Sequence, residues 1–163
     1  MRRLTKILTV CLMATFCSTA MATTYSALTS METQVAKTSN TPAAITLAGT
    51  STAAFKVEGS KITIKRAGDY YLSAAAQVGG AAAGNIYLWL RVNGKDLADS
   101  NSVQNIPSKD FTAVLVSQGG MTFKAGDVFE LVYAASAPGL GLVASTPAGM
   151  PAVPSIIFAI FEL

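Results

Sequence analysis

The stretch from Ile86 to Val92 limits the fold more than any other part of the sequence, because its side chains alternate with a period of two. One face would be aliphatic (Ile86, Leu88, Leu90 and Val92), and the other would carry Tyr87, Trp89 and Arg91. Such alternation is typical of a β-strand with one buried face. Asn93-Gly94 follows at once and favours a tight hairpin turn, because both residues accept positive φ angles. The pattern predicts a β-hairpin here.

Short apolar runs of the same kind recur along the chain, and no window has helical periodicity. We expect strands at residues 45–48, 53–57, 61–65, 70–78, 86–92, 111–117, 121–124, 128–135 and 156–161. Glycine, proline and two Ala-Gly-Asp triplets mark the turns, and Gly119-Gly120 is expected to end a strand. This pattern indicates an all-β, antiparallel β-sandwich or jelly roll. We place that domain at residues 43–163, after a polar stretch at 23–42 that is either an N-terminal arm or a marginal first strand.

Residues 1–22 have the pattern of a secretory signal peptide. Three basic residues precede an apolar run from Ile7 to Phe16, and small residues occupy the end of the segment at Ala20 and Ala22. The apolar run has about ten residues, too few to span a bilayer, which needs roughly 20. We therefore expect Sec-type export to the periplasm, the cell surface or the medium, with no membrane span.

The composition after this segment excludes several classes of protein. Residues 23–163 contain neither cysteine nor histidine, since Cys11 and Cys17 both precede them. Disulfides, thiol chemistry, histidine-based acid–base catalysis and the usual zinc sites are therefore excluded. Nine basic residues balance nine acidic ones, which argues against nucleic-acid binding, because that requires a surplus of positive charge.

The last strand, residues 156–161, is apolar on both faces. One face can meet the opposite sheet, and we expect the core there to contain Leu88, Leu90, Phe129, Leu131, Ile156, Phe158 and Ile160. A sandwich covers only one side of each sheet, so the other face needs a further partner. A second copy of the chain is the simplest partner. The interface residues that we expect, side by side in one patch, are Tyr87, Trp89, Ile157, Ala159 and Phe161.

Four motifs occur in the order and spacing of a known family. They are residues 67–71 (Ala-Gly-Asp-Tyr-Tyr), 88–94 (Leu-Trp-Leu-Arg-Val-Asn-Gly), 125–131 (Ala-Gly-Asp-Val-Phe-Glu-Leu) and 151–157 (Pro-Ala-Val-Pro-Ser-Ile-Ile). Over nearly all of the chain after the signal, the sequence resembles the jelly-roll superfamily of the complement-component-q globular head and tumour necrosis factor, in its bacterial and phage surface-protein version. The resemblance implies a ten-strand-type sandwich that forms a compact homotrimer and serves binding or structure.

The expected function is a secreted or surface-displayed trimeric structural or interaction module without catalysis. The alternative is an adhesin-like secreted protein that binds a glycan or another protein, with Tyr87 and Trp89 stacking on a sugar. A glycan-active enzyme is the remote alternative. Asp69 and Asp127 would be its paired carboxylates, but both follow the glycine of an Ala-Gly-Asp triplet, which favours a role in the turn.

No cofactor and no catalytic residue are predicted. Calcium is the metal that the available oxygen ligands suit best, and Asp96, Asp99 and Asn101 follow the Asn-Gly turn closely enough to converge in a loop. Their spacing lacks the EF-hand pattern, and aspartate and asparagine are ordinary loop residues. These three residues are therefore weak calcium candidates.

Overall fold

A computed structural model describes residues 24–163, and the expected signal peptide lies outside the described residues. All regular structure in this part of the chain is β-strand. The strands are β1 (Tyr25–Ser30), β2 (Gln34–Val35), β3 (Ala43–Ala44), β4 (Phe55–Glu58), β5 (Lys61–Ile64), β6 (Gly68–Gly80), β7 (Gly84–Val92), β8 (Lys95–Asp96), β9 (Ser102–Ile106), β10 (Ala113–Phe123), β11 (Val128–Ala135), β12 (Leu140–Leu142) and β13 (Ile156–Glu162). They form two antiparallel sheets, which confirms the all-β sandwich.

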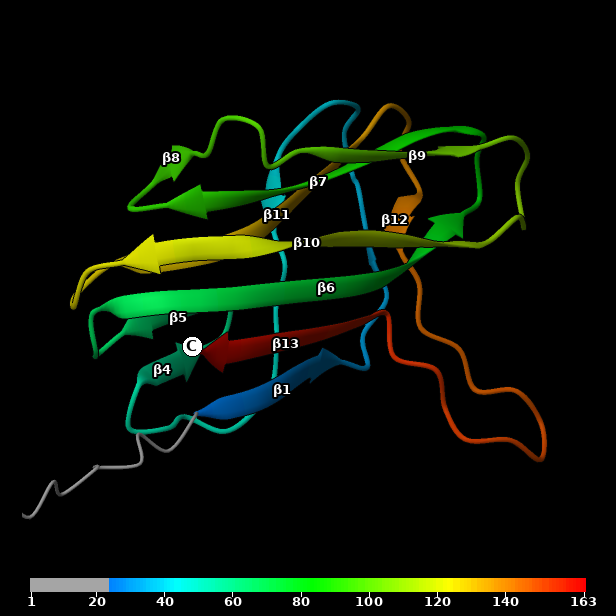
Figure 1. Cartoon of the computed structure of the whole chain (residues 1–163). Coiled ribbons are helices and arrows are strands. Elements are labelled where there is room, and N and C mark those ends of the chain that lie inside the picture. The colour runs from blue at the N-terminus through cyan, green and yellow to red at the C-terminus, as the bar shows by residue number, and fades with distance from the viewer. Residues whose placement is uncertain (1–23) are drawn as a thin grey trace, which may run out of the picture.

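The first sheet is built around β6, its longest strand. β10 pairs over its whole length with one edge of β6, and the other edge of β6 pairs with β13 and then with β12. β1 lies outside β13, and β2 outside β12, so that β1, β13, β6 and β10 run side by side (Figure 1). Burial alternates along β6 because every second side chain faces the other sheet.

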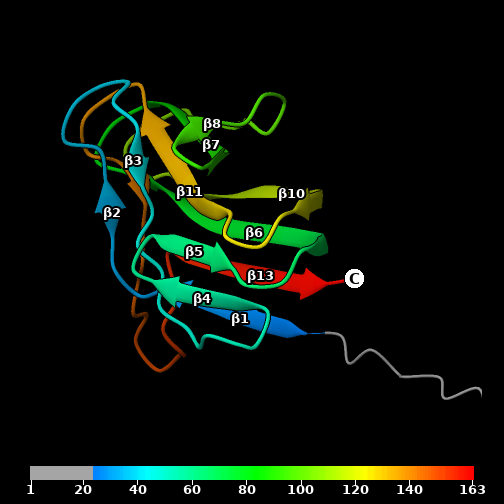
Figure 2. The same ribbon diagram turned by 90° about the vertical axis from the view of Figure 1, so that its left-hand side faces the viewer.

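The second sheet has the order β4-β5-β11-β7, and both β8 and β9 pair with the far edge of β7. β3 continues the line of β5 along the edge of β11, and Figure 2 shows this sheet from the side. The predicted hairpin joins β7 to β8. Its turn residues Asn93 and Gly94 have φ angles of 50° and 78°, as a two-residue hairpin turn requires.

A cluster of aromatic rings joins the two sheets. Phe129 of β11 stacks on Phe123 of β10 with 5.2 Å between ring centroids, and it meets Phe158 of β13 edge-on at 6.0 Å. Tyr70 of β6 adds an edge contact to Phe123 at 5.8 Å. The inward-facing residues expected from the sequence are buried, with Leu90 as the exception. Leu90 packs against the core but is only half-buried, because it borders a pocket that opens at the edge of the sandwich.

The start of the sandwich differs from the expected boundary at residue 43. β1 is a full strand that pairs with β13 from Tyr25 to Ser30, and its Leu28 side chain is completely buried. Polar residues hide this strand in the sequence, because serines occupy two of its three inward positions. β1 therefore lies within the stretch 23–42 and forms part of the first sheet.

Other differences arise where a strand has weak side-chain signals. β10 continues through Gly119 and Gly120, which were expected to end it, because these glycines pair with Leu72 and Tyr71 of the long strand β6. β9 and β12 were not predicted at all. β9 is mostly polar and β12 has only three residues, so both depend on pairing with a neighbouring strand.

Candidate functional site

The outer side of the first sheet carries a broad surface without charge at its centre. Outward side chains of β1, β13, β6 and β10 meet there in rows, because directly paired residues share a face. Its large apolar members include Tyr25, Val114, Val116 and Ile157, which are 54%, 56%, 51% and 48% exposed. Within residues 24–163, Asp69, at one end of β6, is the only charged residue that these four strands contribute to it. We call this surface the uncharged face.

Aromatic side chains form one end of the uncharged face. Phe161 lies between Tyr25 on β1 and Tyr71 on β6, with ring centroids 4.7 and 6.4 Å away. The next rows contain Ala159 and then Ile157, which lies between Thr29 and Ala75. Three of the expected interface residues, Ile157, Ala159 and Phe161, therefore do share one surface.

The other two expected interface residues lie elsewhere. Tyr87 and Trp89 belong to β7, in the second sheet, and point to the outer side of that sheet because Ile86 and Leu88 point inward. The expectation that they lie beside Ile157 and Phe161 is wrong. The sequence could not reveal this, because alternation shows which residues share a face of one strand but not which strands share a sheet.

A shallow pocket with a volume of about 470 Å³ contains Tyr87 and Trp89, and we call it the aromatic pocket. Polar groups come from Asn40 and from the loop after β8, and Pro42 and Ala134 add apolar surface. The Trp89 indole nitrogen is buried and completes no hydrogen bond within the described residues. Aromatic rings beside carboxylates and amides are suited to a ligand with both apolar faces and hydroxyl groups.

The weak calcium candidates Asp96, Asp99 and Asn101 all line this aromatic pocket. Asp96 is engaged elsewhere, since its carboxylate accepts a hydrogen bond from Arg91 Nε at 2.7 Å. That hydrogen bond is the largest cause of the lowered pKa of Asp96. The described residues contain no group of three or more aspartate, glutamate, histidine or cysteine side chains placed to hold a metal ion. Calcium binding stays a prediction.

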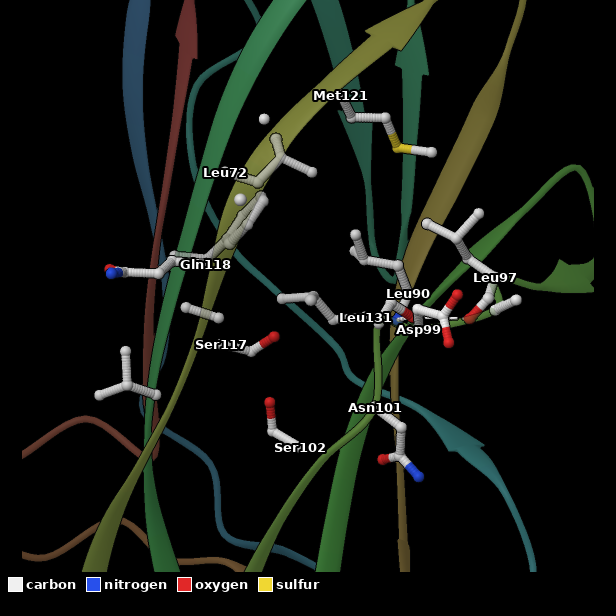
Figure 3. Close-up of a pocket in the computed structure, with 17 residues that line it drawn as sticks. Leu72, Leu90, Leu97, Asp99, Asn101, Ser102, Ser117, Gln118, Met121 and Leu131 are labelled. Atoms are coloured by element: carbon white, nitrogen blue, oxygen red, sulfur yellow. Dashed lines mark hydrogen bonds between the residues drawn. The ribbon is translucent and has the colours of Figure 1, made fainter.

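A second pocket, of about 420 Å³, opens between β10 and the segment that joins β8 to β9, and we call it the edge pocket (Figure 3). It reaches into the space between the sheets. Its floor is formed by Leu72, Ala74, Leu90, Met121, Leu131 and Phe158, and its polar rim includes Asp99, Asn101, Ser102, Ser117 and Gln118. This pocket was not predicted from the sequence. The feature of the sequence that could have indicated it is the small size of Ala74 and Gly119, which occupy inward positions where neighbouring strands carry large side chains.

No protein-family model and no curated protein matches the sequence. Solved structures of murine APRIL, a protein of the tumour necrosis factor family, are similar to it in fold. The crystal structure at pH 5.0 aligns with a TM-score of 0.60 and 14% identity, and the one at pH 8.0 with 0.56 and 12%. Each alignment covers 86% of this chain and 100% of the APRIL chain. The fold is a TNF-like jelly roll.

This finding confirms the fold that the sequence resemblance implied. Identities this low show the fold alone, because one jelly roll serves many functions. Among residues 24–163, no helix is long and apolar enough to cross a membrane.

The two Ala-Gly-Asp carboxylates make separate hydrogen bonds in different parts of the jelly roll. Asp127 accepts hydrogen bonds from Asn93 Nδ2 at 2.9 Å and from the Lys124 backbone N–H at 2.7 Å, which ties its turn to the β7–β8 hairpin. Asp69 accepts a hydrogen bond from the Thr122 hydroxyl, across the pairing of β6 with β10 in the other sheet. Each carboxylate therefore has a structural partner of its own, but only Asp127 accepts a backbone hydrogen bond within its turn, since Asp69 belongs to β6 and accepts across to β10.

These contacts predict a pH-dependent role for Asp127. The hydrogen bond from Asn93, followed by that from Lys124, lowers the pKa of Asp127 from its ordinary value of 3.8. Stability gained this way is present above the ordinary pKa and is lost as pH falls through the lowered one. We expect Asp127→Asn to lower the free energy of unfolding at pH 7, and the difference from wild type to shrink below about pH 3.8. Urea unfolding at several pH values measures this.

Glu32→Gln is the matched control for Asp127→Asn, because it also removes one carboxylate charge. The Glu32 side chain is exposed and makes no side-chain hydrogen bond within the described residues. Its variant should unfold like the wild type throughout. A loss in Asp127→Asn that is equally large at pH 3 and pH 7 would show that the charged carboxylate is not what stabilises the turn.

Proposed function

We propose that the protein is an exported, non-catalytic interaction module that assembles into a closed homotrimer through the uncharged face. One observation carries this proposal: several large apolar side chains are about half exposed on the outer side of one four-strand surface that lacks charge at its centre. Soluble monomers rarely expose a contiguous apolar patch of this kind. The outward residues Ile157, Ala159 and Phe161 are part of the proposed interface.

Energetics and symmetry favour association of identical copies. Burying one large apolar side chain contributes about 1.5–3 kcal/mol, and every copy contributes the same set. The nine basic and nine acidic residues after the signal leave no net charge to oppose association. Closed rotational symmetry prevents the open-ended polymer that a head-to-tail contact produces. The number three comes from the resemblance to the complement-component-q and tumour necrosis factor superfamily, and the surface itself requires only a partner.

Export rests on the signal-peptide pattern of residues 1–22. We propose delivery to the periplasm, the cell surface or the medium, as in the bacterial and phage surface proteins that the sequence resembles. Amino-terminal sequencing of the protein recovered outside the cytoplasm should begin at Thr23 or within a few residues of it. Recovery there with Arg2 and Lys6 still attached would contradict cleavage.

The decisive experiment is the molar mass of the purified protein by light scattering at micromolar concentration. We expect a mass three times that of one chain, without larger species. A stable monomer would contradict the proposed assembly. A dimer would be consistent with the uncharged face as an interface but would contradict the homotrimer implied by the resemblance.

A glycan- or protein-binding function is the second candidate, and the aromatic pocket favours it. Trp89 is the only tryptophan of the chain, so its fluorescence reports on this pocket alone. A monomer whose Trp89 fluorescence is quenched by acrylamide, and changes when a glycan is added, would favour this candidate. A trimer with Trp89 fluorescence indifferent to glycans would leave the structural module as the supported function.

A further inference from the structure

We propose that the edge pocket binds a small neutral amphiphile, with its apolar body on the floor and a hydroxyl or amide group at the rim. The pocket lies within one chain, and it shares Val116 with the uncharged face. Its volume of about 420 Å³ falls in the range of ligand pockets, which runs from roughly 300 to 1,000 Å³.

The floor of the pocket is part of the hydrophobic core. Leu72, Ala74, Leu131 and Phe158 line it although they are at most 3% exposed, so the pocket reaches the inner faces of both sheets. The space exists because Ala74 and Gly119 are small: a Cβ atom added to Gly119 would meet no atom within 4 Å. An apolar body placed there would regain the packing contacts that the lining atoms lack.

Two half-buried hydroxyl groups lie directly above this floor. Ser117 projects inward from β10 and Ser102 begins β9, and Figure 3 shows the two side chains close to each other at the pocket. Neither side chain makes a hydrogen bond to another described residue, so both can donate to and accept from a ligand. Ser100 is not available in this way, because its hydroxyl donates to the Leu97 carbonyl at 2.9 Å and accepts from the Leu90 backbone N–H at 3.1 Å.

The charge of the rim decides between neutral and acidic ligands. Among the described residues that line the pocket, Asp99 is the only charged one, and none is a lysine or an arginine. A carboxylate-bearing amphiphile would therefore meet a like charge without a cation to offset it. An alcohol or an amide of the same chain length carries no charge, so Asp99 does not repel it, and it can hydrogen-bond to the hydroxyl and amide groups of the rim.

The first test uses N-phenyl-1-naphthylamine, a neutral dye that brightens in apolar surroundings. We expect saturable binding of one dye per chain to the purified protein. Gly119→Leu should weaken binding at least tenfold, because its side chain occupies the pocket. Gly68→Leu is the matched control: Gly68 is also a strand glycine without positive φ and with free space at its Cβ, but it lies outside the pocket. It should bind the dye like the wild type.

The second test displaces the dye and identifies the polar end of the ligand. 1-Decanol should displace it at concentrations about tenfold lower than decanoate, which has the same chain length but carries a charge. Ser117→Ala should weaken displacement by decanol about fivefold, since one neutral hydrogen bond is lost. Circular dichroism spectra that match the wild type would show that these variants are folded.

Three outcomes would overturn the proposal. Undiminished dye binding by folded Gly119→Leu would place the dye elsewhere, and equal displacement by decanol and decanoate would remove the preference for a neutral ligand. The Ile157→Lys variant carries a charge on the uncharged face and is expected to be a monomer. Dye binding to this variant but not to the wild type would show that a second copy covers the pocket in the assembled protein. The assembly is tested separately by light scattering, so failure of either proposal can be recognised on its own.

Discussion

Replacing Ile157 by lysine is expected to convert the assembled protein into monomers. Ile157 is 48% exposed in the single chain and lies near the middle of the uncharged face, between Thr29 of β1 and Ala75 of β6. In the assembly this position would be buried, so the variant loses apolar burial and must also remove a charge from water. The combined cost is about 3 kcal/mol or more per chain, roughly a 100-fold weaker association.

The matched control for this change is Val103→Lys. Val103 is 57% exposed and pairs with Tyr87, so it lies on the outer side of the second sheet, away from the uncharged face. Light scattering and sedimentation velocity should give a monomer for Ile157→Lys and the wild-type mass for Val103→Lys. Ile157→Lys should keep its fold, because an outward position takes no part in the core. Equal masses for both variants would reject the uncharged face as the interface.

Replacing Phe129 by alanine is expected to be the most destabilising single change in the core. Its ring is fully buried and is the member of the aromatic cluster that the second sheet contributes, in contact with Phe123 and Phe158 of the first sheet. Truncation of a buried phenylalanine costs about 3–5 kcal/mol, because the transfer free energy is lost and a cavity remains. Phe129→Leu keeps most of the volume and should cost less than about 1.5 kcal/mol.

Chemical denaturation in the Ile157→Lys background measures these values, because unfolding of a monomer does not depend on protein concentration. Phe111→Ala is the control, since it removes the same ring from an exposed loop position and should change stability by about 0.5 kcal/mol or less. A loss below about 1 kcal/mol for Phe129→Ala would mean that the ring does not join the two sheets as described.

Much of the fold could be predicted from local patterns. Alternation along residues 86–92 identified one strand and its inward face, the apolar run at 156–161 identified another strand, and Asn93-Gly94 identified the hairpin turn. Such signals are readable because the side-chain period of a strand and the φ preferences of turn residues depend only on neighbours in sequence. β1 and β9 were harder to predict, because serines and amides occupy many of their positions. These strands depend on backbone pairing with β13 and β7 more than on buried apolar side chains.

The candidate sites also depend partly on local sequence patterns and partly on long-range strand pairing. The sequence by itself determined the two-sided apolar strand at the end of the chain, and with it the need to cover Ile157 and Phe161. Only the tertiary structure decided which other residues share a surface with Ile157 and Phe161. Tyr25 lies on β1, which pairs with β13, and Val116 lies on β10, two strands away from β13, while Trp89 lies in the other sheet. The edge pocket likewise exists only where Gly119, which pairs with Leu72, lies one inward row from Ala74, which pairs with Ser117, and the β8–β9 segment lies beside them. Strand order and sheet membership arise from long-range pairing, which the period of a single strand does not encode.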